Sequence, residues 1–166
     1  MKTLYIMCGV GFSGKSTLSK MIAEHLHATL VSQDGMFFEK EKELNLNVDS
    51  EEQWKMLLGM CRDKIKEELG KGNSVVFDDT SLRFSHREKL RNIAKEADAE
   101  SKVVFLDTPI EIQKQRQEHN KNTKERHDVK QEYLDQTIAE LEVPTLDENV
   151  IVVKPGYDFD EVISRL

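Results

Sequence analysis

The chain has 166 residues and a mass of 19.2 kDa, and its 24 basic and 31 acidic side chains give a formal net charge of −7 at pH 7. This length suits one domain with its own core, over residues 1–166. The acidic balance argues against non-specific binding to duplex nucleic acid or anionic lipid, because both need a basic surface. Two cysteines are too few for a disulfide scaffold, and no apolar stretch is long enough to span a membrane. We expect a reduced cytoplasmic protein with no membrane partner.

Near-continuous apolar runs predict buried strands that are covered by helices on both faces. In chain order these strands are 3–8, 28–32, 74–77, 102–106 and 150–153, of which the second has the weakest pattern. Apolar residues at helical spacing predict helices over 15–27, 51–69 and 86–99, and Pro109 opens a further helix that ends near Arg116. This alternation predicts an α/β fold, with three layers (α/β/α) around a five-stranded parallel sheet.

Three connections between the predicted elements are long or unusual. Residues 34–50 follow the weak second strand, residues 117–130 are almost entirely polar, and residues 142–149 contain Pro144. Ligands of open α/β sheets bind beyond the carboxyl ends of the strands. The first two connections are therefore candidate substrate or lid segments, and we place a small lid at about 117–130.

A glycine-rich loop, residues 9–17 (GVGFSGKST), follows the first strand directly and fits the pattern G-x-x-x-x-G-K-[ST]. Glycines let backbone N–H groups approach phosphate oxygens, and the N-terminus of the next helix favours an anion. Lys15 is expected to reach the β- and γ-phosphates, and the Ser16 hydroxyl to bind Mg²⁺. A plain glycine turn would explain the glycines but not the Lys15-Ser16 pair. The residues predicted to bind nucleotide are Gly9, Gly11, Phe12, Ser13, Gly14, Lys15, Ser16 and Thr17.

Other features narrow the class of nucleotide-binding protein. The guanine-reading motif N-K-x-D is absent, since Asn120-Lys121-Asn122 is followed by Thr123 and does not come after a strand. GTP is therefore disfavoured and ATP is the expected nucleotide. The chain is too short for the added elements of transporters or AAA+ motors. Polar groups at strand ends are typical of small kinases.

Acidic residues follow the second and third predicted strands. Asp34 is placed to face the γ-phosphate from the acceptor side and to take the proton of an acceptor hydroxyl; the alternative is a turn or helix-capping aspartate. Asp78 and Asp79 end the third strand, and one of them is expected to serve Mg²⁺ together with Ser16. The other, with Thr80, caps the next turn or contacts substrate.

Basic residues near the predicted lid are candidates for stabilising charge during phosphoryl transfer. Arg116 and Arg126 are the predicted catalytic arginines, and an exposed, charge-rich helix and loop is an equally good explanation for either. Asp107-Thr108-Pro109 is interpreted as strand end, N-cap and helix start. His119 and His127 lack metal-ligand spacing.

Taken together, these residues resemble the small P-loop kinases of the AAA_33 or zeta-toxin-like group, which are similar to the kinase domain of phage polynucleotide kinase. The match includes the phosphate loop, Asp34 and residues 75–82 (VVFDDTSL), where the group has an apolar strand ending in Asp-Thr-Asn or Asp-Ala-Thr. Arg87 matches an arginine that follows that motif, and residues 142–145 (EVPT) are similar to Phe-Glu-x-Pro.

The resemblance implies an adenylate-kinase-like core, ATP as donor, Asp34 as general base, Arg87 as an acceptor-binding residue and an arginine-bearing lid. Polynucleotide kinases follow the aspartate with an acid, an aromatic residue and an arginine, where this chain has residues 35–38 (GMFF). The acceptor pocket is thus expected to be more apolar, which disfavours a nucleic-acid acceptor. In the lid, Lys121 or Lys124 is an alternative to Arg126.

These observations predict an ATP- and Mg²⁺-dependent kinase that phosphorylates a hydroxyl of a small molecule. Residues 34–60 are expected to line the acceptor side, although helix core is the better explanation for Trp54. The predicted substrate residues are Asp34, Phe37, Thr80 and Arg87. One alternative is a polynucleotide or tRNA kinase with a basic track beside Arg83, Arg87 and Arg91. Another is a nucleotide-bound regulatory protein that catalyses no transfer.

Overall fold

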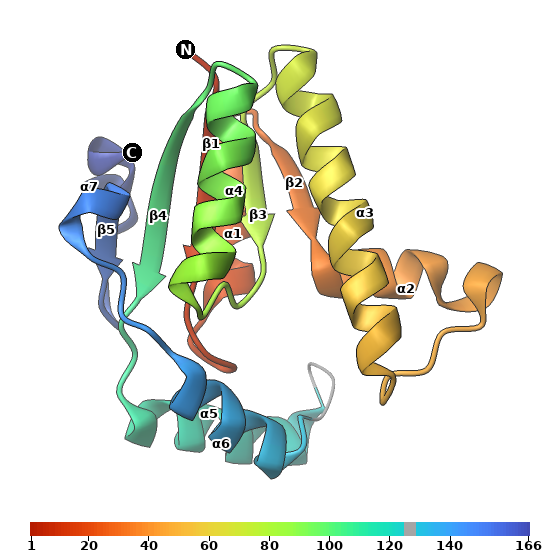
Figure 1. Cartoon of the computed structure of the whole chain (residues 1–166). Coiled ribbons are helices and arrows are strands. Elements are labelled where there is room, and N and C mark those ends of the chain that lie inside the picture. Colours follow the sequence, from red (N-terminus) through yellow and green to blue (C-terminus); the bar gives the residue numbers. More distant parts are fainter. Residues whose placement is uncertain (125–128) are drawn as a thin grey trace.

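A five-stranded parallel sheet with the strand order β2-β3-β1-β4-β5 forms the centre of the computed structural model, which describes residues 1–124 and 129–166 (Figure 1). The strands are β1 (Thr3–Cys8), β2 (Thr29–Ser32), β3 (Val75–Asp78), β4 (Glu100–Leu106) and β5 (Val150–Val153). The helices are α1 (Lys15–His25), α2 (Gln33–Leu44), α3 (Glu51–Gly70), α4 (Phe84–Glu96), α5 (Ile110–Thr123), α6 (Gln131–Glu140) and α7 (Phe159–Arg165), with a 3-10 turn, η1 (Leu146–Glu148).

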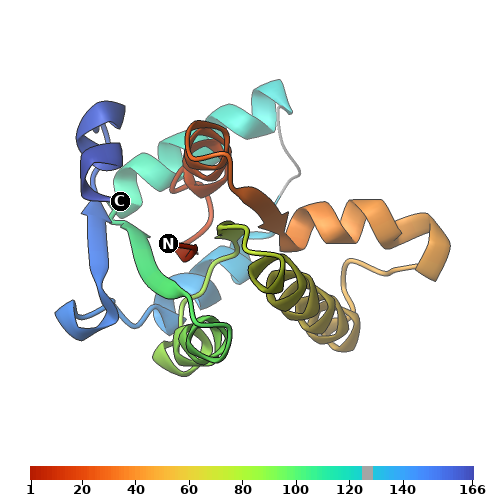
Figure 2. The ribbon, with the colours of Figure 1, turned by 90° about the horizontal axis from the view of Figure 1, so that it is seen from above.

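Helices cover both faces of this sheet, which confirms the predicted three-layer α/β/α fold. Figure 2 shows α1 and α7 on one face and α3 and α4 on the other. Alternate residues of β1 enter the two cores: Leu4 and Ile6 pack with α3 and α4, and Tyr5 and Met7 pack with α1 and α7. Because both faces of β1 are buried, its sequence is continuously apolar.

The carboxyl ends of the strands all meet at one edge of the sheet, and three helices gather there. In Figure 1 this is the lower edge, where α5 and α6 lie below the strands and α2 extends to one side. Parallel strands with helical crossovers produce this arrangement, because each strand must start again from the same edge. The phosphate loop leaves β1 at this edge.

Two sequence-based expectations about helices were wrong. The helix after Pro109 does not end near Arg116 but continues to Thr123, because its buried side is lined by the amides Gln113, Gln117 and Asn120 rather than by apolar residues. Much of the 117–130 segment is therefore helical. The connection 34–50 is mostly helix α2, whose pattern is weak because only Phe37 of its residues is buried.

The two-sided core generates a stability prediction. Phe77 on β3 is fully buried against α3 and α4, whereas Phe84 at the start of α4 is exposed. We expect Phe77→Ala to lower the free energy of unfolding by about 3–5 kcal/mol, and Phe84→Ala by less than about 0.5 kcal/mol. Urea titrations of both variants measure these changes. Equal losses would contradict the assignment of Phe77 to the core.

Candidate active site

The phosphate loop adopts a conformation that depends on its glycines. Gly9 and Gly14 have φ values of 148° and 98°, which side chains disfavour, and Gly14 precedes the first residue of α1. Gly11 lies under α6, since a Cβ added there would stand 2.5 Å from Leu134 Cδ2. The Gly9 N–H donates to the Thr80 carbonyl at 3.1 Å, which joins the loop to the turn after β3.

Lys15 lies inside this loop. Its Nζ donates to the Val10 carbonyl at 2.8 Å and to Ser13 Oγ at 3.4 Å, and the side chain is buried. Ser16 and Thr17, next on α1, are exposed. An ammonium held inside a glycine-rich loop at the N-terminus of α1 is a site that favours a polyphosphate.

The start and middle of α5 contact the loop from the side. Thr108 Oγ1 donates to the Ser13 carbonyl at 3.1 Å, and Arg116 Nη1 donates to the Phe12 carbonyl at 3.0 Å. Arg116 Nη1 also lies 3.4 Å from the position of a Cβ on Gly14. The structure thus brings Arg116 to the phosphate loop, while Arg126 falls outside the described residues.

The two adjacent acids after β3 have different surroundings. Burial raises the pKa of Asp78, while the charge of Lys15 and the nearby side chain of Ser16 act to lower it. Asp79 turns away and accepts from the Ser81 N–H at 3.2 Å and the Ser81 hydroxyl at 3.4 Å. Only Asp78 is therefore directed at the phosphate loop.

Asp34 occupies the first turn of α2 and is exposed. The helix N-cap is Ser32, whose Oγ accepts from the Gly35 N–H at 3.2 Å, so Asp34 itself is not the capping residue. The charge of Asp34 acts on both Asp78 and Tyr133, which places it beside the end of β3.

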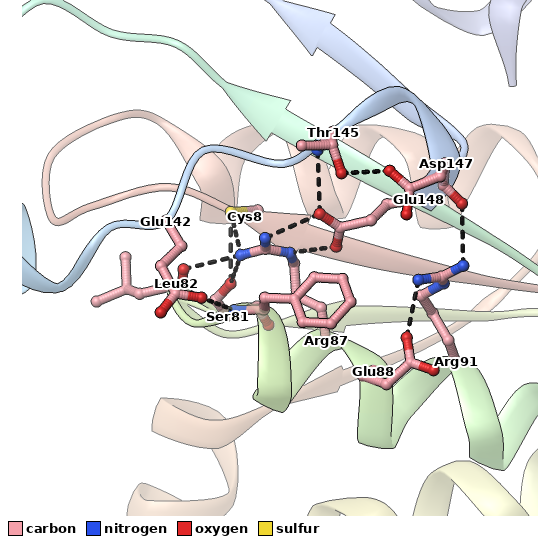
Figure 3. Close-up of polar contacts among 11 residues, drawn as sticks. Cys8, Ser81, Leu82, Arg87, Glu88, Arg91, Glu142, Thr145, Asp147 and Glu148 are labelled. Carbon is pink, nitrogen blue, oxygen red and sulfur yellow. Dashed lines mark hydrogen bonds and ion pairs between the residues drawn. The ribbon is translucent and has the colours of Figure 1, made fainter.

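Arg87 was predicted to bind the acceptor, and the structure corrects this prediction (Figure 3). Its side chain is fully buried, and its guanidinium forms a two-pronged ion pair with Glu148, at 2.6 Å and 3.0 Å. Nη1 donates to the carbonyls of Ser81 and Leu82 at 3.0 Å and 2.8 Å. These internal partners keep Arg87 away from any acceptor.

Phe37 was also predicted to contact substrate, but its ring is buried against Trp54, with centroids 4.8 Å apart and an interplanar angle of 17°. The stack joins α2 to α3, so Phe37 belongs to the packing between these helices, whereas Phe38 is exposed. Thr80 lies beside the loop through its carbonyl contact with Gly9.

Three residues near the carboxylates were missed in the sequence. Tyr133 lies on α6, a helix not predicted, and half of its surface is exposed. Partial desolvation of its phenol raises the pKa, and the charges of Asp79 and Asp34 add to this effect. His86 on α4 has Nδ1 3.8 Å from Asp79 Oδ2, and the charge of Arg62 on α3 acts on His86. No motif marks these residues, because they come from three separate helices.

The donor set fits Mg²⁺ rather than a transition metal. Within residues 1–124 and 129–166 there is no cluster of three or more His, Cys, Asp or Glu side chains that would hold a metal alone. Ser16 and Asp78 instead supply two oxygen groups beside the phosphate loop. Mg²⁺ commonly takes one or two protein oxygens and completes its shell with water and phosphate oxygens.

The Arg87–Glu148 pair generates a prediction for stability and its pH dependence. Arg87→Met leaves Glu148 buried and unpaired, so we expect a loss of about 3–5 kcal/mol in the free energy of unfolding. Arg91→Met, which removes a surface pair with Glu88 at 2.8 Å, is the matched control and should cost less than about 1 kcal/mol.

Hydrogen bonds and the charge of Arg87 outweigh burial and hold the pKa of Glu148 below its ordinary value of 4.5. The stabilisation is therefore complete above pH 4.5 and is lost as the pH falls through the lower, folded value. The deficit of Arg87→Met should shrink over that same range, as measured by urea unfolding at a series of pH values. A deficit that stays constant would contradict this account.

Comparison with known proteins places this geometry in a family. A family model for the AAA domain AAA_33 matches residues 4–144. A probable gluconokinase of Schizosaccharomyces pombe is 26% identical over 157 residues, 91% of this chain and 78% of the relative.

In the described part of the chain, no helix combines the length and apolar character needed to cross a bilayer.

Solved structures of kinases share the fold. A gluconokinase from Sinorhizobium meliloti 1021 has a TM-score of 0.68 and 21% identity, covering 98% of this chain and 88% of that one. The APS kinase CysC of Mycobacterium tuberculosis, solved in complex with AMPPNP and APS, has a TM-score of 0.72 and 20% identity, covering 99% and 96%. The P-loop kinase fold expected from the sequence is confirmed, and the chain belongs to the AAA_33 family.

Proposed function

We propose that this chain is an ATP-dependent kinase that transfers the γ-phosphoryl group of ATP to a hydroxyl of a small molecule. The observation that carries the proposal is that Lys15 and Ser16 of the phosphate loop and the exposed Asp34 all act on Asp78 at the end of β3. Phosphate-binding, metal-binding and proton-accepting groups thereby meet at one edge of the sheet. The relatives whose names describe small-molecule kinases support the same activity.

In the proposed reaction, the N–H groups of residues 9–17 and the Lys15 ammonium bind the phosphates of ATP. Asp34 accepts the proton of the acceptor hydroxyl, whose oxygen forms a bond to the γ-phosphorus. The bond from that phosphorus to the β,γ-bridging oxygen breaks, and its electron pair leaves with ADP. Arg116, joined by Arg126, stabilises the charge that develops on the transferred group. Mg²⁺ held by Ser16 and Asp78 would neutralise phosphate charge.

The surface around α4 favours a small acceptor over a nucleic acid. Arg83 pairs with Glu140 at 3.0 Å, Arg91 pairs with Glu88, and Arg87 is buried. The basic track that a polynucleotide or tRNA kinase would need is therefore neutralised by neighbouring acids, and the net charge of −7 adds to the repulsion of a long polyanion.

The proposed base is tested by Asp34→Asn, with Glu41→Gln, an exposed carboxylate on the same helix, as control. We expect Asp34→Asn to lower kcat for the acceptor by about 10²- to 10⁴-fold, because the hydroxyl loses its proton acceptor, while ATP affinity is unchanged. Coupled measurement of ADP release against a panel of hydroxyl acceptors gives both quantities. Wild-type turnover in Asp34→Asn, or no acceptor that raises turnover, would instead favour the regulatory nucleotide-binding alternative.

The two acids after β3 should differ in their effect on the metal requirement. Asp78→Asn is expected to raise the Mg²⁺ concentration for half-maximal rate by about ten- to a hundredfold, because it weakens the oxygen group beside Ser16. Asp79→Asn should leave that concentration unchanged, since Asp79 is bound to Ser81. Magnesium titrations of the initial rate compare the two variants, and a larger shift for Asp79→Asn would reverse the assignment.

A further inference from the structure

Gly11 of the phosphate loop is a glycine for a different reason from its neighbours. Gly9 and Gly14 have φ values of 148° and 98°, in the region that side chains disfavour, whereas Gly11 does not have a positive φ. The backbone conformation at position 11 therefore does not itself call for glycine. The missing side chain must have another cause, and that cause lies on α6.

A side chain of α6 occupies the space that a Cβ on Gly11 would need. The position of that Cβ is 2.5 Å from Leu134 Cδ2, and of the described residues beyond its chain neighbours only Leu134 comes within 4 Å of it. Carbon atoms of packed side chains normally stay about 3.5–4.0 Å apart. Because Leu134 is buried, a methyl group on residue 11 would force Leu134 into another rotamer or move α6.

Both ends of α6 are attached to other parts of the molecule, and Figure 1 shows the helix below the end of β1. Just after the C-terminal end, the Glu142 N–H donates to the Leu82 carbonyl at 3.0 Å. Just before the N-terminal end, Lys130 Nζ lies 2.6 Å from Asp49 Oδ1, in the connection between α2 and α3. These contacts keep Leu134 beside the phosphate loop.

The backbone around Gly11 carries the carbonyls that hold two basic side chains of the site. The Val10 carbonyl accepts from Lys15 Nζ at 2.8 Å, and the Phe12 carbonyl accepts from Arg116 Nη1 at 3.0 Å. Phe12 has a φ of 59°, a conformation that costs free energy in a residue with a side chain and persists only where its surroundings hold it. A shift of Gly11 would therefore disturb the groups expected to bind phosphate.

We propose that Leu134 is a positioning residue for the nucleotide, which through its contact with Gly11 holds the backbone of residues 10–12 in the conformation that binds phosphate. Leu134 acts through the loop and touches no reacting atom. Preorganisation of this kind increases affinity, because the loop is already ordered before the ligand arrives. The inference rests on the nucleotide binding of the proposed kinase and not on the identity of its acceptor.

The experiment is a double-mutant cycle between Gly11 and Leu134, measured by calorimetric titration of AMPPNP in the presence of Mg²⁺. Gly11→Ala should raise the Kd by about ten- to a hundredfold, because the new methyl group overlaps Leu134. Leu134→Ala should raise the Kd by about three- to tenfold, because the loop loses its support. In the double variant the methyl group fills the vacated space, so adding Gly11→Ala to Leu134→Ala should change the Kd by less than about twofold.

Three further variants show whether the contact itself is responsible. Leu134→Met, which keeps the apolar volume, should bind AMPPNP nearly as wild type does. Gly59→Ala adds a methyl group on α3 where no described atom lies within 4 Å, and Ile138→Ala shortens a half-buried side chain of α6. Both are matched controls and should leave the affinity unchanged. Thermal unfolding of every variant checks that the fold is retained.

Two results would overturn the inference: an effect of Gly11→Ala that is equally large with and without Leu134, or wild-type affinity in Leu134→Ala. Turnover separates this inference from the proposed function, since Leu134→Ala should raise the KM of ATP and leave kcat unchanged. If the cycle shows coupling but no hydroxyl acceptor raises turnover, the proposed transfer alone fails. If an acceptor is phosphorylated but the double variant is not rescued, the role of Leu134 alone fails.

Discussion

The carboxyl edge of the sheet depends on one buried ion pair, that of Arg87 with Glu148. The side chain of Arg87 is fully buried, so water does not compete for its donors. Nη1 of its guanidinium also donates to the Ser81 and Leu82 carbonyls. Ser81 has a positive φ of 43°, so the turn after β3 needs such support. Glu148 in turn accepts from the Thr145 N–H at 3.0 Å, which extends the network to the segment before β5.

This network determines which partners each of the two adjacent aspartates has. With Ser81 held from inside by Arg87, its N–H and hydroxyl are directed at Asp79. Asp78, one residue earlier on the strand, is left to face Ser16 and Lys15. A turn built in this way keeps one carboxylate beside the phosphate loop and the other beside His86.

Charge in this protein is arranged locally rather than globally. The net charge is −7, and most exposed basic residues near the site are neutralised by neighbouring acids, as for Arg83 with Glu140. The positive groups that contact the phosphate loop are Lys15 and Arg116. Such a surface suits small phosphorylated or anionic molecules better than long polyanions.

The sequence by itself determined the strands, the parallel α/β architecture and the phosphate loop, because continuous apolar runs and the spacing of Gly14, Lys15 and Ser16 are local properties. It did not distinguish Asp78 from Asp79, since their difference arises from a turn that Arg87 holds across the fold. Sequence also misassigned Arg87 and Phe37, because nothing local shows whether a side chain is buried. Only the tertiary structure decided those roles and placed His86 and Tyr133 near Asp79, since packing places helices distant in sequence around one edge of the sheet.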